Sequence, residues 1–205
     1  MNCDNIKIET LETVYKPAED SYLLIEMLSE YLKDKKEKMT LLDMGSGTGI
    51  IGLCAATNKN ISKVIMADIN KESIMLTKRN FLANKHQIKA DINIVESDLF
   101  DKLDTFIFNI ITFNPPYLPN ENNAELMKDA FYGGWSGIET TKRFLEKAKS
   151  HIAKDGRIFI IASSLSDIES LRRFIIASDF KIENEGKIHI FFEDIIGIEL
   201  SNIDK

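Results

Sequence analysis

The segment Asn114-Pro115-Pro116-Tyr117 contains the residue types that most directly suggest chemistry. It follows an apolar run, and its prolines fix φ and remove N–H donors, so that backbone carbonyls stay free to accept hydrogen bonds. An amide or exocyclic amine is a poor nucleophile because its nitrogen lone pair is delocalised. If the Asn114 side-chain oxygen and the Pro115 carbonyl both accept from such an NH2 group, they aim its nitrogen at an electrophile, while Tyr117 stacks on the planar group. The segment therefore predicts a site for N-methylation.

The predicted reaction is a direct, in-line transfer of a methyl group. It needs neither a covalent intermediate nor a strongly basic side chain, because the proton leaves after the attacking nitrogen has become cationic. Taken alone, the segment is equally compatible with a Pro-Pro turn that ends a strand beside a packed tyrosine. Its interpretation as a reactive site therefore depends on the segments that precede it.

A glycine-rich loop, Asp43-Met44-Gly45-Ser46-Gly47-Thr48-Gly49, lies between an apolar run and a helical pattern. Glycines let the backbone turn sharply and approach a ligand that a Cβ atom would repel. The loop therefore predicts a nucleotide cradle. Residues 47–52 also match G-x-G-x-x-G, and Asp68 follows Gly49 by 19 residues, which leaves an NAD-dependent dehydrogenase as an alternative.

Two features favour S-adenosylmethionine over a dinucleotide as the cofactor. The additional Gly45 follows Asp43, whose carboxylate is an anion able to meet the cationic methionine end of this ligand. Asp98 and Leu99 follow the third predicted strand, where Asp98 can accept from the adenine amino group and Leu99 can pack on the ring. With Asp68 in register as well, we expect S-adenosylmethionine in the glycine-rich loop.

The elements that position these residues alternate along the chain, and the apolar periodicity predicts their type. Alternation of strand and helix indicates an α/β fold, a doubly wound, mainly parallel seven-stranded sheet that ends in an antiparallel hairpin. The only long stretch without periodicity, 115–137, follows a strand and is placed to touch a substrate. The expected helices are 17–33, 50–57, 71–84, 138–152 and 167–177, and the expected strands are 40–44, 63–67, 92–96, 106–113, 157–162, 181–192 and 195–201, the last two joined at Glu193-Asp194.

Length and composition restrict the class of protein. With 205 residues, 44% of them hydrophobic, the chain suits one domain over 1–205, with an N-terminal extension and helix at 1–38 and a catalytic core at 39–205. The net charge of -6 disfavours nucleic acid as a partner. Cys3 and Cys54 do not share a metal-ligand spacing with the three histidines, so no metal site is expected. Neither a leader nor a membrane-spanning run is evident, which predicts a cytoplasmic protein.

With these motifs in place, the chain resembles the HemK family of protein-glutamine methyltransferases, of the class I methyltransferase fold. It is most similar to the short eukaryotic and archaeal branch, over nearly the whole chain. The Pro-Ala-Glu-Asp start and the Gly-Gly-x-x-Gly loop are more specific than the glycine-rich loop. The segments that carry the resemblance are 14–21, 43–49, 68–70, 98–99, 114–117 and 133–137.

The resemblance implies a substrate and a set of site residues. Members of this branch methylate the glutamine of the Gly-Gly-Gln tripeptide in class I translation termination factors, and residues 114–117 would hold that glutamine. By extension, Glu19 and Asp20 shape the mouth of the pocket. The positions that match the family's cofactor site are Ser21, Asp43, Gly45, Gly47, Gly49, Asp68, Ile69, Asp98, Leu99 and Asn114.

The resemblance also implies a partner, a small zinc-binding activator protein that pairs with the edge of the third strand. Ile92, Ile94 and Val95 lie on that strand, and an apolar edge needs a cover. We therefore expect a heterodimer. Trp135 either contacts the incoming protein substrate or anchors its loop on its own domain.

Three other functions stay open at this point. An adenine-N6 nucleic-acid methyltransferase would use the same acceptors for a planar NH2, although the acidic balance weighs against it. A lysine methyltransferase needs no such pair, because a deprotonated amine is already nucleophilic. A non-catalytic scaffold has no use for Asn114.

Overall fold

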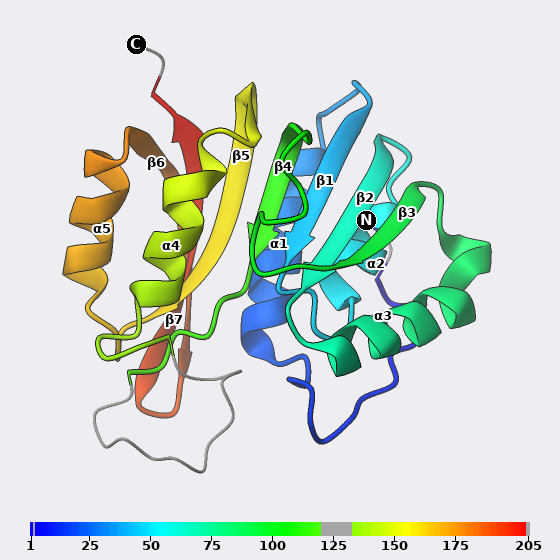
Figure 1. The fold of residues 1–205 in the computed structure, drawn as a ribbon, viewed down its shortest axis with the longest axis horizontal. Coiled ribbons are helices and arrows are strands. Elements are labelled where there is room, and N and C mark those ends of the chain that lie inside the picture. Colours follow the sequence, from blue (N-terminus) through cyan, green and yellow to red (C-terminus); the bar gives the residue numbers. More distant parts are fainter. Residues whose placement is uncertain (2, 120–132, 204–205) are drawn as a thin grey trace.

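The computed structural model describes residues 1, 3–119 and 133–203, in which seven strands form one sheet (Figure 1). The strand order is β3-β2-β1-β4-β5-β7-β6. The neighbours from β3 to β5 pair in parallel, and β7 is antiparallel to both β5 and β6. The doubly wound sheet with an antiparallel hairpin is thus confirmed. The strands are β1 Met39–Met44, β2 Ile61–Asp68, β3 Asp91–Glu96, β4 Phe108–Phe113, β5 Ile152–Ser163, β6 Phe180–Ile190 and β7 Glu193–Asn202.

Helices cover both faces of the sheet, and each face has its own apolar core (Figure 1). Side chains alternate between the faces along a strand, so Leu41 belongs to one core and Leu42 to the other. The first core lies under α1 and α2, and the second under α4 and α5. Among the described residues the helices are α1 Glu19–Leu32, α2 Ile50–Ala56, α3 Lys71–Asn84, α4 Glu139–Ala148 and α5 Ile168–Ala177, with a short 3-10 turn at Lys85–Gln87.

The strand register brings the predicted functional segments to one edge. Met44 is paired with both Ala67 and Phe113, and Asp68 is paired with Glu96. Parallel strands in this register end side by side, so the loops that follow β1, β2, β3 and β4 emerge next to one another. The crevice outside the carboxyl ends of parallel strands is where open α/β sheets bind ligands.

Two predicted boundaries are wrong. The hairpin does not turn at Glu193-Asp194, because these residues pair with Ile190 and His189, and the turn falls on 191–192. A polar pair is a typical turn signal, whereas two phenylalanines are not. The helix expected at 138–152 ends at Ala148, and the next strand begins at Ile152 because its backbone pairs with β4. Pairing between distant segments is not visible in local periodicity.

The N-terminal segment runs along α3 and is held by asparagine side chains. The Asn84 amide accepts from the Lys7 N–H at 2.9 Å and donates to the Lys7 carbonyl at 2.7 Å. Asn80 pairs in the same way with the N–H and carbonyl of Glu9, at 2.8 and 3.1 Å. These amides make the backbone hydrogen bonds that a neighbouring strand would otherwise make. The N-terminal segment is thereby held along α3 on its way to the carboxyl edge of the sheet. Among the described helices, none has the length and apolar composition needed to span a membrane.

Candidate functional site

A cavity of about 820 Å³ opens at the carboxyl edge of the sheet. Its wall contains residues from the four loops that follow β1 to β4, together with Thr13 to Tyr15 of the N-terminal segment and Thr140 and Arg143 of α4. This volume lies in the range of sites for cofactors and drug-sized molecules.

The glycine-rich loop forms part of the cavity wall. Gly45, Gly47 and Gly49 have left-handed φ values of 62°, 55° and 83°, which favour glycine. Gly45 and Gly47 line the cavity. Gly49 precedes α2, and a Cβ atom there would be 2.9 Å from Thr77 Cγ2. Gly49 therefore permits close packing of the loop on α3 and is not part of the cavity wall.

Asp43 lies beneath this loop and not on the cavity wall. Its side chain is fully buried, and it accepts hydrogen bonds from the Gly52 N–H at 2.9 Å and the Thr112 hydroxyl at 3.0 Å. Burial raises its pKa to about 7. The expectation that Asp43 directly meets a cationic ligand group does not agree with this position. The carboxylate instead ties the end of β1 to α2 and β4.

Asp68 and Ile69, after β2, do lie on the cavity wall. Asp68 accepts from the backbone N–H groups of Gly47 and Asn70, both at 2.8 Å. Burial raises its pKa, although these hydrogen bonds favour the charged form. Ile69 is largely exposed and offers apolar surface. This part of the cavity combines a fixed carboxylate with an exposed apolar side chain.

Asp98 and Leu99, after β3, also line the cavity. Leu99 is buried and has a left-handed φ of 46°. Asp98 accepts from the Arg143 guanidinium of α4 at 3.0 Å. Sequence reasoning missed Arg143, since nothing in the local pattern of a helix reveals that one residue reaches a distant loop.

The acceptor segment 114–117 lines the same cavity, next to Gly45 of the glycine-rich loop. The Asn114 amide nitrogen donates to Asp20 Oδ2 at 3.0 Å. Asn114 Oδ1 is buried and has no hydrogen-bond partner among the described residues. A buried acceptor without a donor costs free energy, and such groups in native structures call for an explanation. Asn114 thus lines a ligand-sized cavity, and its side-chain oxygen is an acceptor without a donor.

Asp20 holds the side chains of the acceptor segment through hydrogen bonds. Besides Asn114, its Oδ2 atom accepts from the hydroxyls of Tyr15 at 2.7 Å and Tyr117 at 3.0 Å, while Oδ1 accepts from the Ser21 N–H and hydroxyl. Asp20 is only 2% exposed, so it lies in the depth of the cavity and not at its mouth as expected. Burial, and next the Asp20 charge, raise the pKa of both tyrosines, which stay protonated donors.

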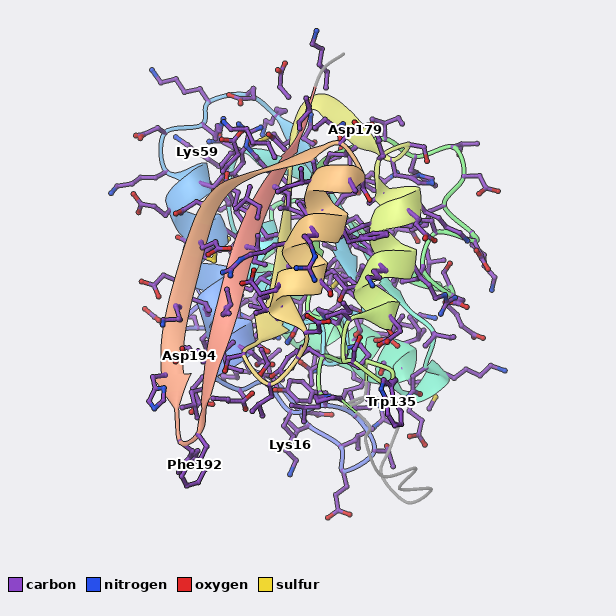
Figure 2. All side chains as sticks on the ribbon, turned by 90° about the vertical axis from the view of Figure 1, so that its left-hand side faces the viewer. Lys16, Lys59, Trp135, Asp179, Phe192 and Asp194 are labelled. Atoms are coloured by element: carbon purple, nitrogen blue, oxygen red, sulfur yellow. The ribbon has the colours of Figure 1, made fainter. Side chains whose placement is uncertain are left out.

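The loop 133–137 packs against the acceptor segment. The Gly133 N–H donates to the Leu118 carbonyl at 3.0 Å, and a Cβ atom on Gly133 would be 2.4 Å from the Pro116 carbonyl oxygen. Trp135 is 69% exposed and stands at the same end of the molecule as Lys16 (Figure 2). This exposure favours contact with an incoming protein over anchoring of the loop on its own domain.

The strand expected to bind an activator protein, β3, is an edge strand of the sheet. Ile92 and Ile94 pack against the core under α1 and α2, while Val95 packs against the other core. All three are half-buried, and their strand pairs with β2 on one side only within the described part of the chain.

Comparison with known proteins agrees with this arrangement. The model of the Methyltransferase small domain family matches residues 7–191. A Methanocaldococcus jannaschii protein assigned as a protein N5-glutamine methyltransferase is 33% identical over 198 residues, 95% of each chain. The release factor glutamine methyltransferase of Lactococcus lactis is 26% identical over 76% of this chain, which spans 58% of that protein.

Among solved structures, the Mtq2-Trm112 complex of E. cuniculi, described as responsible for methylation of the eRF1 translation termination factor, resembles this chain. The TM-score is 0.67 at 20% identity, over 93% of this chain and 99% of that one. At this identity the likeness establishes the fold alone.

Proposed function

The chain belongs to the family of methyltransferase small domains, and on this premise we propose that it methylates the side-chain nitrogen of a glutamine. The proposed substrate is the Gly-Gly-Gln glutamine of a class I translation termination factor, and the methyl donor is S-adenosylmethionine. Relatives named for this activity, from M. jannaschii and L. lactis, support the substrate class. A cytoplasmic location follows from the substrate.

The residues of the cavity fit this cofactor, which supplies a methyl group on a cationic sulfur. Because Gly45 and Gly47 have no Cβ atom, the cofactor would approach the backbone of the glycine-rich loop closely. Ser21 lies in the same wall. The Asp68 carboxylate would accept from ribose hydroxyls. Ile69 and Leu99 would enclose the adenine ring, whose amino group would donate to Asp98.

The single observation that carries the proposal is the unpartnered Asn114 Oδ1 atom. Because Asp20 takes the amide nitrogen, the oxygen is the end left for an incoming donor. A glutamine amide brings two N–H donors, of which the second would meet the Pro115 carbonyl. Two acceptors bias the nitrogen away from its planar form and hold its lone pair toward the methyl group.

The steps assigned to this chain are binding and orientation of the glutamine side chain. The cofactor would supply the methyl group. Asn114 and the Pro115 carbonyl would hold the glutamine nitrogen toward it, and this nitrogen would lose one proton once it carries the methyl group. No side chain has to remove a proton first. The neutral hydroxyls of Tyr15 and Tyr117 keep Asp20 fixed throughout.

We further propose that β3 binds a small zinc-binding activator protein through its free edge. An edge strand presents unpaired backbone groups, which invite pairing with another chain. The fold shared with the Mtq2-Trm112 complex supports a partner of this kind. Full activity of the isolated, soluble, monomeric chain would contradict this part of the proposal.

The test is mass spectrometry of a purified termination factor incubated with S-adenosylmethionine and this protein, with and without the activator. We expect one added methyl group on the Gly-Gly-Gln glutamine, and none with the Asn114→Ala variant. DNA and RNA oligonucleotides serve as a parallel arm. A rate on adenine that equals the rate on the factor would replace glutamine by adenine as the substrate.

A further inference from the structure

Two phenylalanine rings stand uncovered at the tip of the β6–β7 hairpin. Phe191 is 87% exposed and Phe192 is 94% exposed, the largest exposures among the apolar side chains that the structure describes. Phe191 also has a left-handed φ of 51°, which is rare for an aromatic residue. A hairpin turn of Asn and Gly would have avoided both the exposure and this backbone conformation. The aromatic turn therefore suggests a role outside the fold of the domain.

The hairpin tip lies directly beside the cavity wall. Glu193, the next residue, lies on the cavity wall. The backbone of Asp194 is bonded twice to Ser164, to its N–H and its hydroxyl, both at 2.9 Å. Leu165, which follows Ser164, is 52% exposed. The two rings and Leu165, called here the hairpin-tip patch, thus lie next to Glu193 and Ser164, beside the cavity wall.

The positions of the side chains at this end of the molecule agree with a hairpin tip beside the cavity. Phe192 lies at the same end as Lys16 and Trp135, whereas Lys59 and Asp179 mark the opposite end (Figure 2). A protein that inserts a side chain between the glycine-rich loop and the acceptor segment must cover this end.

We propose that the hairpin-tip patch binds the protein substrate and holds apolar side chains that flank its target glutamine. The proposal rests on the function proposed above. Exposed aromatic rings beside a polar site are typical anchors of protein interfaces. The rings lie beyond the cavity, so a substrate no larger than a free amide would not reach them.

The charges near the tip disfavour other macromolecules. Lys187 and His189 both pair with Asp194, at 3.0 and 2.8 Å, and Glu193 adds a further acidic group. The positive charge of Lys187 is thus compensated locally, which leaves little attraction for nucleic-acid phosphates or anionic lipid headgroups.

The test uses the double variant Phe191→Asn/Phe192→Ser in the complete chain, with the activator where activity requires it. Asn tolerates a left-handed φ, so the turn is kept. We expect the KM for the termination factor to rise about 30-fold, the equivalent of one interface hot spot, with kcat retained. The KM for a short Gly-Gly-Gln peptide and the Kd for S-adenosylmethionine should not change. Ile176→Ser, an exposed apolar residue on α5, is the matched control.

A second measurement separates this proposal from the proposed function. Calorimetric binding of the factor to the wild type and the double variant does not require methyl transfer. Weaker binding by the variant supports the proposal that the patch binds the substrate, even if no methyl group is transferred. Absence of methyl transfer overturns only the proposed function. Equal binding overturns the patch. A wild-type dimer that the variant loses in light scattering, or wild-type binding to phosphatidylglycerol vesicles, would assign the patch to another occupant and also overturn it.

Discussion

The Asn114 amide nitrogen donates to Asp20 Oδ2 at 3.0 Å across 94 residues of sequence, and this bond determines which end of the amide remains without a partner. The same carboxylate oxygen accepts from Tyr15 and Tyr117, so its lone pairs are fully used. Three donors on one buried anion fix the Asn114 side chain before any ligand arrives. Orientation of this kind lowers the cost of reaching the reactive geometry.

The Asp20→Asn variant should lose activity mainly because the Asn114 side chain is no longer held in one orientation. The new amide has one acceptor oxygen in place of two, and its NH2 group faces donors, so the Asn114 amide is free to rotate. We expect kcat for methyl transfer to fall roughly 10²-fold, with a smaller change in the Kd for S-adenosylmethionine. Steady-state kinetics and calorimetry separate the two effects. Asp34→Asn, at an exposed position after α1, is the control, and an unchanged kcat in Asp20→Asn would contradict the assigned role.

Asn80 connects the N-terminal segment to the glycine-rich loop, and its replacement should destabilise the protein. Its amide donates to the carbonyls of Thr48 at 2.9 Å and Glu9 at 3.1 Å. Asn80→Leu would leave these groups and the Glu9 N–H without their partner, and we expect the free energy of unfolding to fall by about 2 kcal/mol or more. Urea unfolding measures the loss. Asn184→Leu, exposed on β6, should change stability far less; equal effects would argue against the connection.

Two glycine substitutions in adjacent parts of the chain should impair different properties, one the stability of the fold and the other the binding of the cofactor. A Cβ atom at Gly52 would be 2.6 Å from Met66 Cγ, inside the packed interface of α2 with β2, so Gly52→Ala should reduce stability strongly. At Gly47 the nearest atom is 4.0 Å away, and the cost is the left-handed backbone, about 1 kcal/mol. Gly47→Ala should instead weaken cofactor binding, because its methyl group enters the cavity wall. Thermal unfolding and calorimetry on both variants decide the point, and the reverse pattern would refute it.

The buried Asp43 carboxyl should make stability depend on pH. Its folded pKa of about 7 lies above the ordinary value of 3.8, so its contribution is fully present below about pH 4 and is lost as pH rises through 7. The maximal slope is about 1.4 kcal/mol per pH unit. In Asp43→Asn the new amide can donate to the Thr112 hydroxyl oxygen, because that hydroxyl lies 3.3 Å from the Leu42 carbonyl and can donate there instead.

This pH dependence is measured as a difference between the wild type and Asp43→Asn. Across pH 4 to 7 the wild type should lose stability relative to the variant, and above pH 8 the difference should be constant. Chemical denaturation at each pH gives both curves. Parallel curves through the whole window would show that the Asp43 pKa is not raised.

The sequence by itself determined the order of the elements and the segments that meet at the carboxyl edge of the sheet. Gly45, Gly47, Asp68, Asp98 and Asn114 each follow a recognisable apolar run, and parallel strands place such positions together. These inferences succeed because they depend on residue type and on periodicity within a short stretch. The family resemblance added the substrate class, which no local pattern could supply.

The tertiary structure alone decided where individual side chains point and what they bind. It placed Asp43 under the loop, brought Arg143 to Asp98, and gathered Tyr15 and Tyr117 on Asp20. It also put the hairpin turn at two exposed phenylalanines and not at the predicted Glu193-Asp194. The reason is physical: a hydrogen bond between distant segments depends on how helices and strands pack, and packing is a property of the whole chain that local periodicity does not encode.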